Sequence, residues 1–138
     1  MKPLDALLSI IVGLAIFAAV EVGGTQFGVR TAITPEIWLD GGVYALGALL
    51  TRWGFAPLFR RARGAAIILG AVLFTMVFPV VTGLVGGLAD LSLGGGTTQS
   101  AFTVTPINTI LTFGLELWFV ALPATFVGAL VLFAARRS

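Results

Sequence analysis

A row of threonines that leads to a carboxylate carries the clearest chemical pattern in the sequence. Three threonines and one glutamate recur three and four positions apart: Thr105, Thr109, Thr112 and Glu116. This spacing places the four side chains on one face of a helix. Glu116 lies roughly six residues, or about 9 Å at the helical rise, inside one end of the last apolar segment. A carboxylate at such a depth in lipid costs on the order of 3 kcal/mol, so we expect this face to meet protein or water.

Three interpretations of Glu116 remain open. Its carboxyl group is structural, either protonated or hydrogen-bonded to a neighbouring helix, or it holds a partner subunit, or it binds or relays an ion or a proton. The corresponding position in the first half of the chain falls between Gly42 and Ala45. No symmetric pair of carboxylates is therefore predicted.

Catalytic and metal-binding patterns are missing from the rest of the sequence. The chain contains no histidine and no cysteine, which removes the commonest general base and the commonest metal and haem ligands. Its serines therefore have no histidine to activate them, and no glycine-rich phosphate-binding loop follows a strand. We expect a protein that is not an enzyme and that carries no cofactor or metal.

The composition indicates an integral membrane protein. Of the 138 residues, 58% are hydrophobic and 10% are charged, and the mean hydropathy is +1.07. A soluble domain carries about 25% charged residues. Segments of roughly 20 apolar residues, enough to cross a hydrocarbon core of about 30 Å as a helix, recur along the chain.

Four membrane-spanning helices are predicted, because lipid satisfies no backbone hydrogen bonds and helices satisfy their own. They cover Leu4 to Val22, Glu36 to Phe55, Ala65 to Leu88 and Ile107 to Ala135. The second segment carries Asp40 near its start and Arg52 near its end. It is either a span with charged ends or a partly interfacial helix. The predicted fold class is an all-α, polytopic membrane protein.

Basic residues orient these spans. Seven of the eight fall on one side of a four-span chain: Lys2, Arg52, Arg60, Arg61, Arg63, Arg136 and Arg137. Arg30 falls on the other side, where Glu21 and Asp40 also lie, and the outer loop with Asp90 has no basic residue. The positive-inside rule then places both termini in the cytoplasm, an N-in/C-in topology. The cluster Arg60, Arg61 and Arg63, with Arg136 and Arg137, is interpreted as a cytoplasmic anchor and not as a nucleic-acid site.

The two halves of the chain resemble each other. The segments IIVG at 10–13 and IILG at 67–70 match, as do Thr-Gln at 25–26 and 98–99, Thr-Pro at 34–35 and 105–106, and Leu-Phe at 58–59 and 132–133. The matches are collinear and predict a tandem repeat of two helical hairpins, related by an axis near the membrane normal. Residues 1–63 form the first hairpin with its arginine-rich connector. Residues 64–138 form the second, with a longer outer loop around Gly94 to Thr98.

Prolines and small residues shape the predicted helices. Pro79 and Pro123 lie inside spans three and four, where each removes a backbone donor and kinks its helix. Either kink is a fixed bend of the bundle or a hinge with an exposed carbonyl group. Glycines such as Gly13, Gly83 and Gly128 permit close helix contacts, within one chain or between chains.

The expected function follows from these features. We predict a non-catalytic structural, assembly or accessory subunit of a membrane complex or homo-oligomer, in a prokaryotic or viral inner or plasma membrane. Its expected partners are the lipid bilayer, other membrane subunits and copies of itself. The alternative is a small ion or proton channel or transporter whose path follows the stripe from Thr105 to Glu116.

Overall fold

The computed structural model describes residues 3–26, 37–61, 63–94, 97–116 and 118–135. Its elements are α1 (Pro3–Gln26), α2 (Ile37–Gly54), α3 (Ala56–Arg61), α4 (Ala65–Ser92), η1 (Ser100–Val104), α5 (Thr105–Leu111), η2 (Thr112–Glu116) and α6 (Trp118–Ala135), where η marks a π-helical turn. All of these elements are helical, so the predicted all-α fold class is confirmed for the described chain.

Three of the described helices are long and apolar enough to cross a membrane. They are α1 over Pro3–Gly23, α4 over Ala65–Ser92 and α6 over Trp118–Ala135. The 18-residue α2 is less apolar, because Asp40 lies in its first turn and Arg52 in its last. The structure therefore has three described helices that are capable of crossing a membrane, and α2 is not clearly a fourth.

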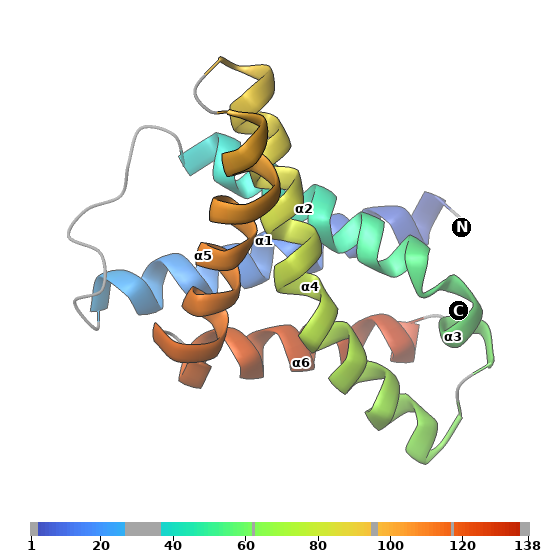
Figure 1. The fold of residues 1–138 in the computed structure, drawn as a ribbon. Coiled ribbons are helices and arrows are strands. Elements are labelled where there is room, and N and C mark those ends of the chain that lie inside the picture. The colour runs from blue at the N-terminus through green and yellow to red at the C-terminus, as the bar shows by residue number, and fades with distance from the viewer. Residues whose placement is uncertain (1–2, 27–36, 62, 95–96, 117, 136–138) are drawn as a thin grey trace.

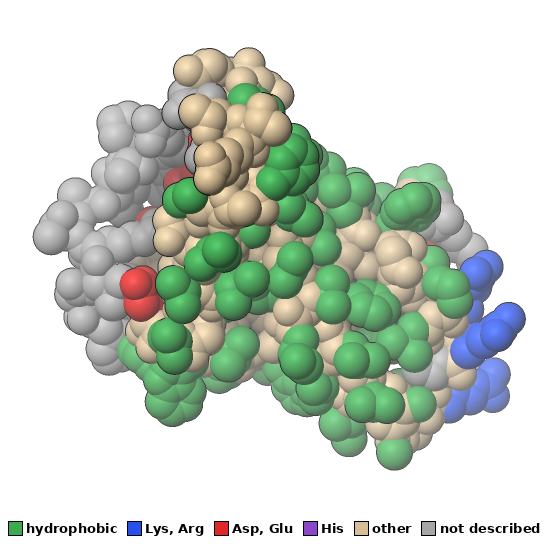
Figure 2. All heavy atoms as spheres, viewed as in Figure 1, with side chains coloured by type: hydrophobic (Ala, Val, Ile, Leu, Met, Phe, Trp, Pro, Cys, Tyr) green, Lys and Arg blue, Asp and Glu red, His purple; other side chains and the backbone are tan. Residues whose placement is uncertain are grey.

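The helices form a bundle that α4 crosses obliquely (Figure 1). Helix α1 packs between α2 and α6, while α4 packs on both α2 and α6 and also on α5. Helices α1 and α2 run in opposite directions side by side, and the described start of α1 and end of α6 lie near α3 (Figure 1). At the same end, Arg60, Arg61 and Arg63 are exposed and form the basic patch of Figure 2.

Glycines set how closely these helices approach. A Cβ atom on Gly13 would lie 2.6 Å from the backbone carbonyl oxygen of Tyr44, so α1 touches the backbone of α2. A Cβ atom on Gly128 would lie 2.7 Å from the Val12 side chain, where α6 meets α1. Small residues of this kind replace the hydrophobic drive that lipid does not supply between helices. Much of the predicted small-residue surface is thus occupied by contacts within the chain.

Buried aromatic rings fill the bundle from end to end. Phe59 stacks on Phe133 with ring centroids 3.9 Å apart, and Phe74 lies 6.3 Å from Phe59 and 5.9 Å from Phe78. Phe78 in turn contacts Tyr44 at 6.1 Å. Rings at such spacings attract one another beyond the area they bury, by about 0.5 to 1.5 kcal/mol per pair. This aromatic column connects the basic end of the bundle with its opposite end.

The predicted fourth span is not one continuous helix, which corrects the prediction of a single helix from Ile107 to Ala135. Helix α5 ends at Leu111, a π-helical turn covers Thr112–Glu116, and α6 begins at Trp118. Hydroxyl groups contribute to the change in direction, because Thr109 and Thr112 donate to carbonyl oxygens four residues earlier and such bonds bend helices. Gly114 lies within this turn, and glycine favours a regular α-helix less than residues with a Cβ atom do.

Helix α4 also runs further than predicted, to Ser92 instead of Leu88. It stops where Gly94 adopts a positive φ of 77°, a conformation that glycine reaches without strain. The Gly94 amide then donates to the Leu91 carbonyl oxygen. The chain returns along α4 through η1 and α5, so these three elements form a helical hairpin that projects from the bundle (Figure 1).

Candidate functional site

The predicted threonine stripe is divided by the π-helical turn. Thr105 and Thr109 are half-buried on α5 next to α4, whereas Glu116 is exposed at the end of the turn. A π-helical turn bonds residues five positions apart, so a side chain four positions further along no longer falls on the same face. Glu116 also precedes the apolar helix α6 and does not lie within it. The structure thus brings Thr105 and Thr109 together, keeps Thr112 beside them on the same segment, and separates Glu116.

Thr105 and Thr109 line a pocket of about 150 Å³ at the end of the bundle opposite the arginines. The pocket is built from α1, α2, α4 and α5. Its polar lining consists of three carboxylates, one phenol and three hydroxyls: Glu21, Asp40, Asp90, Tyr44, Thr82, Thr105 and Thr109. Among these described lining residues none is basic. We call this site the acidic pocket.

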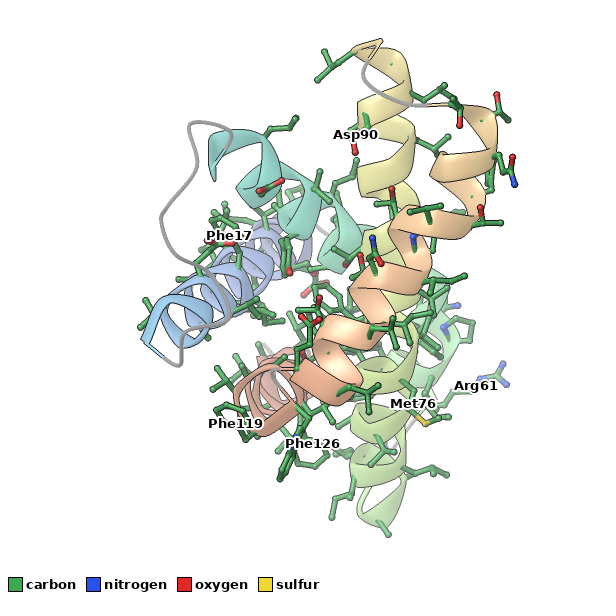
Figure 3. The ribbon with its side chains drawn as sticks, turned by 60° about the vertical axis from the view of Figure 1, so that its left-hand side comes forward. Phe17, Arg61, Met76, Asp90, Phe119 and Phe126 are labelled. Atoms are coloured by element: carbon green, nitrogen blue, oxygen red, sulfur yellow. The ribbon has the colours of Figure 1, made fainter. Side chains whose placement is uncertain are left out.

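The three carboxylates come from the ends of three helices. Glu21 lies on the last turns of α1 and is 9% exposed, and Asp40 lies in the first turn of α2. Asp90 lies in the last turn of α4, on the side that faces α2 (Figure 3). The carboxyl end of a helix carries a partial negative charge, which disfavours an anionic side chain there by about 0.3 to 1 kcal/mol. A cation near Asp90 would remove this penalty.

Thr82 lines the acidic pocket and carries a buried hydroxyl group that has no partner in the described chain. Its side chain is 2% exposed, and within the described chain its Oγ1 atom has no hydrogen-bond partner. Thr75 and Thr125 behave differently, since each donates to a carbonyl oxygen four residues earlier at 2.7 Å. The Thr82 hydroxyl instead lies against Gly47 of α2, where any Cβ atom would collide with it. A buried polar atom left in this state costs about 1 to 3 kcal/mol.

The described carboxylates of the acidic pocket are not grouped as a metal-binding cluster. Among the described residues, no three carboxylate, histidine or cysteine side chains are grouped closely enough to hold a metal ion. The chain also has no histidine that could activate a hydroxyl group as a nucleophile. Carboxylates spread around a pocket with hydroxyls between them can attract and hydrogen-bond a positively charged or donor-rich solute.

A second charged group lies at the opposite end of the bundle. Arg52 is 7% exposed, lies 4.0 Å from a carboxylate oxygen of Asp5, and places its guanidinium 4.0 Å from the centre of the Phe59 ring. The sequence grouped Arg52 with the basic side of the chain but gave no sign of this burial. Of the predicted anchor, Arg60, Arg61 and Arg63 are exposed, while Arg136 and Arg137 lie outside the described residues.

The two predicted kink positions lie inside continuous helices. Pro79 is buried within α4, and Pro123 is exposed within α6. Both helices continue on either side of their proline. Neither proline lines the acidic pocket. If either proline acts as a hinge with an exposed backbone carbonyl group, that hinge lies outside this pocket.

Sequence reasoning placed Glu21, Asp40 and Asp90 on one side of the membrane but did not bring them into one pocket. Their convergence depends on the oblique course of α4, which no local pattern specifies. Comparison with family models, with curated proteins and with solved structures gives no match for this chain. The functional argument therefore rests on the residues described above.

Proposed function

We propose that this protein is a non-catalytic assembly or accessory subunit that packs, through the projecting hairpin, against another membrane subunit or a second copy of itself. The observation that carries the proposal is the outward face of α5. Helix α5 packs on α4, and the opposite face of α5, with the residue that precedes the helix, carries exposed apolar side chains: Val104, Ile107 and Leu111. The exposed amide of Asn108 lies on this same face.

An amide in the middle of an apolar face points to a protein partner. Lipid accommodates Ile107 and Leu111 without loss, but it offers no hydrogen bond to Asn108. Asparagine side chains join neighbouring membrane helices for this reason. A helix from another chain would cover the apolar side chains and satisfy the amide together.

The proposed topology has four spans with both termini in the cytoplasm. Helix α2 supports it, because α2 lies alongside α1 and carries its charges at its two ends. Arg52 at one of these ends lies beside Asp5 at the start of α1, so both charges fall at the same level of the bundle. The exposed arginines at this end fit the positive-inside rule.

The proposed tandem repeat is supported by a contact between equivalent residues. Phe59 and Phe133 occupy matching places in the two halves, and their rings stack at 3.9 Å with an interplanar angle of 7°. Equivalent residues meet in this way near an axis that relates two copies. Gly13 and Gly70 also match, and each allows a close contact within its own hairpin, with α2 and with α6.

The assembly proposal is tested by the state of the solubilised particle. We expect native mass spectrometry in mild detergent to find this chain with other subunits or as an oligomer. An interhelical hydrogen bond in a membrane contributes about 0.6 to 2 kcal/mol, so Asn108→Ala should weaken association by about 3- to 30-fold. Ile68→Ala, which alters an exposed apolar residue near the other end of α4, is the matched control. Monomers throughout, or equal association of both variants, would refute the proposal.

A small transporter is the second candidate, favoured by the opening of Thr105 and Thr109 into the acidic pocket. Reconstituted protein would then conduct an ion or protons across vesicle membranes. Glu116→Gln should leave such a flux unchanged if the pocket is its entrance, because Glu116 lies outside the pocket lining. Vesicles that show no flux of sodium, potassium or protons above that of empty vesicles would reject this candidate.

A further inference from the structure

We propose that the basic patch formed by Arg60, Arg61 and Arg63 binds the headgroups of anionic phospholipids. The inference is independent of the assembly role, which uses the outward face of α5. It joins two observations: a set of exposed guanidinium groups carried by an anchored helix, and exposed apolar side chains at the same end of the bundle.

Helix α3 holds the basic patch in a fixed place. Its Phe59 is fully buried, stacks on Phe133 with ring centroids 3.9 Å apart, and lies 4.0 Å from the guanidinium of Arg52. Arg60 and Arg61 follow Phe59 directly in the chain and are exposed, and Arg61 points away from the bundle (Figure 3). Because the backbone that carries these arginines is already ordered, a bound headgroup loses less affinity to the ordering of the protein.

The charge of the basic patch is not balanced within the described chain. The described carboxylate at this end is Asp5, which pairs with the buried Arg52 at 4.0 Å. No ion pair among the described residues involves Arg60, Arg61 or Arg63. On the face that Figure 2 shows, the acidic side chains lie at the far end of the molecule. An anion is therefore the complementary partner, and the planar fork of arginine matches two oxygens of a phosphate group.

Exposed apolar side chains at the same end favour a lipid over a soluble anion. Leu4 at the start of α1, Trp53 in the last turn of α2 and Ile68 in the first turn of α4 are 58% to 66% exposed. Tryptophan prefers the boundary between hydrocarbon and headgroups. Arginine at this boundary leaves its stem in the apolar layer and extends its guanidinium to the phosphates. An RNA or an acidic protein would meet the arginines but would leave these apolar side chains uncovered.

The fluorescence of Trp53 can report the lipid that lies next to the basic patch. The chain has three tryptophans, so a variant with Trp38→Phe and Trp118→Phe keeps Trp53 alone. Lipids with brominated acyl chains quench a tryptophan that they touch. The protein is reconstituted in phosphatidylcholine bilayers, and quenching by brominated phosphatidylglycerol, which is anionic, is compared with quenching by brominated phosphatidylcholine. One basic residue near an anionic surface strengthens binding by about 5-fold, so we expect Trp53 to prefer phosphatidylglycerol by about 5-fold or more at low salt.

Two triple variants test whether the arginines cause this preference. Replacing Arg60, Arg61 and Arg63 together with glutamine removes the charge and should abolish the preference. Replacing the same three with lysine keeps the charge and should retain most of the preference, which separates the loss of charge from a loss of folding. Salt at about 1 M shortens the screening length to about 3 Å and should weaken the preference of the unaltered patch.

Trp118 provides the control for position. It is exposed at the start of α6, whereas the end of α6 lies beside α3 through the contact of Phe133 with Phe59. A variant with Trp38→Phe and Trp53→Phe keeps Trp118 alone. The two brominated lipids should quench it about equally.

Four results would overturn the proposal. They are equal quenching of Trp53 by the two lipids, an unchanged preference in the glutamine variant, the same loss in the lysine and glutamine variants, and the same preference at Trp118. Binding of a short RNA through these arginines, without a preference for phosphatidylglycerol, would assign the basic patch to a soluble anion and would also overturn it. Both leaflets of these bilayers have the same composition, so the outcome depends neither on the orientation of the protein nor on subunit assembly.

Discussion

Replacing Gly13 with alanine should separate α1 from α2. A Cβ atom at position 13 would lie 2.6 Å from the Tyr44 carbonyl oxygen, 2.8 Å from the Ala45 Cα atom and 2.9 Å from the Ala48 Cβ atom. The first two belong to the backbone of α2, so rotation of a side chain cannot relieve the collision. The two helices have to move apart instead.

The size of this effect follows from two opposing contributions. Overpacking of a close contact costs about 1 to 3 kcal/mol, and the rigid backbone neighbours of Gly13 favour the upper value. Alanine is favoured over glycine inside a helix by about 1 kcal/mol. We therefore expect the Gly13→Ala variant to lose about 2 kcal/mol of unfolding free energy.

Gly42→Ala is the matched control for this measurement. Position 42 lies inside α2, and its Cβ atom would meet nothing within 4 Å. This variant should gain up to about 1 kcal/mol from helix propensity alone. Equilibrium unfolding in mixed micelles, followed by the fluorescence of the three tryptophans, measures both. Equal unfolding free energies for the two variants would refute the packing argument.

Two further predictions concern the basic end of the bundle and the topology. Arg52→Ala should cost about 1 to 3 kcal/mol of unfolding free energy, because it removes the partner of the half-buried Asp5 and uncovers the Phe59 ring. The exposed Arg60→Ala should change it by less than about 0.5 kcal/mol. Similar losses in the two variants would contradict a structural role for the buried guanidinium. The chain has no cysteine, so single cysteines can be labelled without background. Ser92→Cys should react with a membrane-impermeant maleimide in intact cells, and Gly54→Cys should react only after permeabilisation. Labelling of Gly54→Cys in intact cells would exclude the four-span topology.

Apolar composition was enough to predict the helices, because a chain in lipid has few other ways to satisfy its backbone. The ends of α1 and α2 fall within a few residues of the predicted bounds, and Asp40 already marked α2 as the least apolar segment. The break at Thr112–Glu116 was not predictable from hydropathy, since Phe113, Gly114 and Leu115 continue the apolar run. The local hydrogen bonds of the threonines contribute to it.

The acidic pocket illustrates the same limit at the level of single residues. Thr75 and Thr82 lie in the same helix and have similar apolar neighbours in sequence, yet the first hydroxyl bonds its own helix and the second does not. The difference comes from Gly47, which lies 35 positions away along the chain and packs against Thr82. The distribution of basic residues predicted the side of the membrane on which Asp90 lies. The angle at which α4 crosses the other helices determines which residues Asp90 faces.

The aromatic column has an electrical consequence in the proposed orientation. Aromatic rings in contact from Tyr44 through Phe78 and Phe74 to Phe59 fill the bundle between the acidic pocket and the arginine end with hydrocarbon. Most of a transmembrane voltage then falls across these rings, on the cytoplasmic side of the pocket. A charge at the level of the pocket would therefore sense a small part of the roughly 2.3 kcal/mol per 100 mV that a complete crossing involves. The side chains of Glu21 and Asp40 should accordingly respond little to a change of membrane potential.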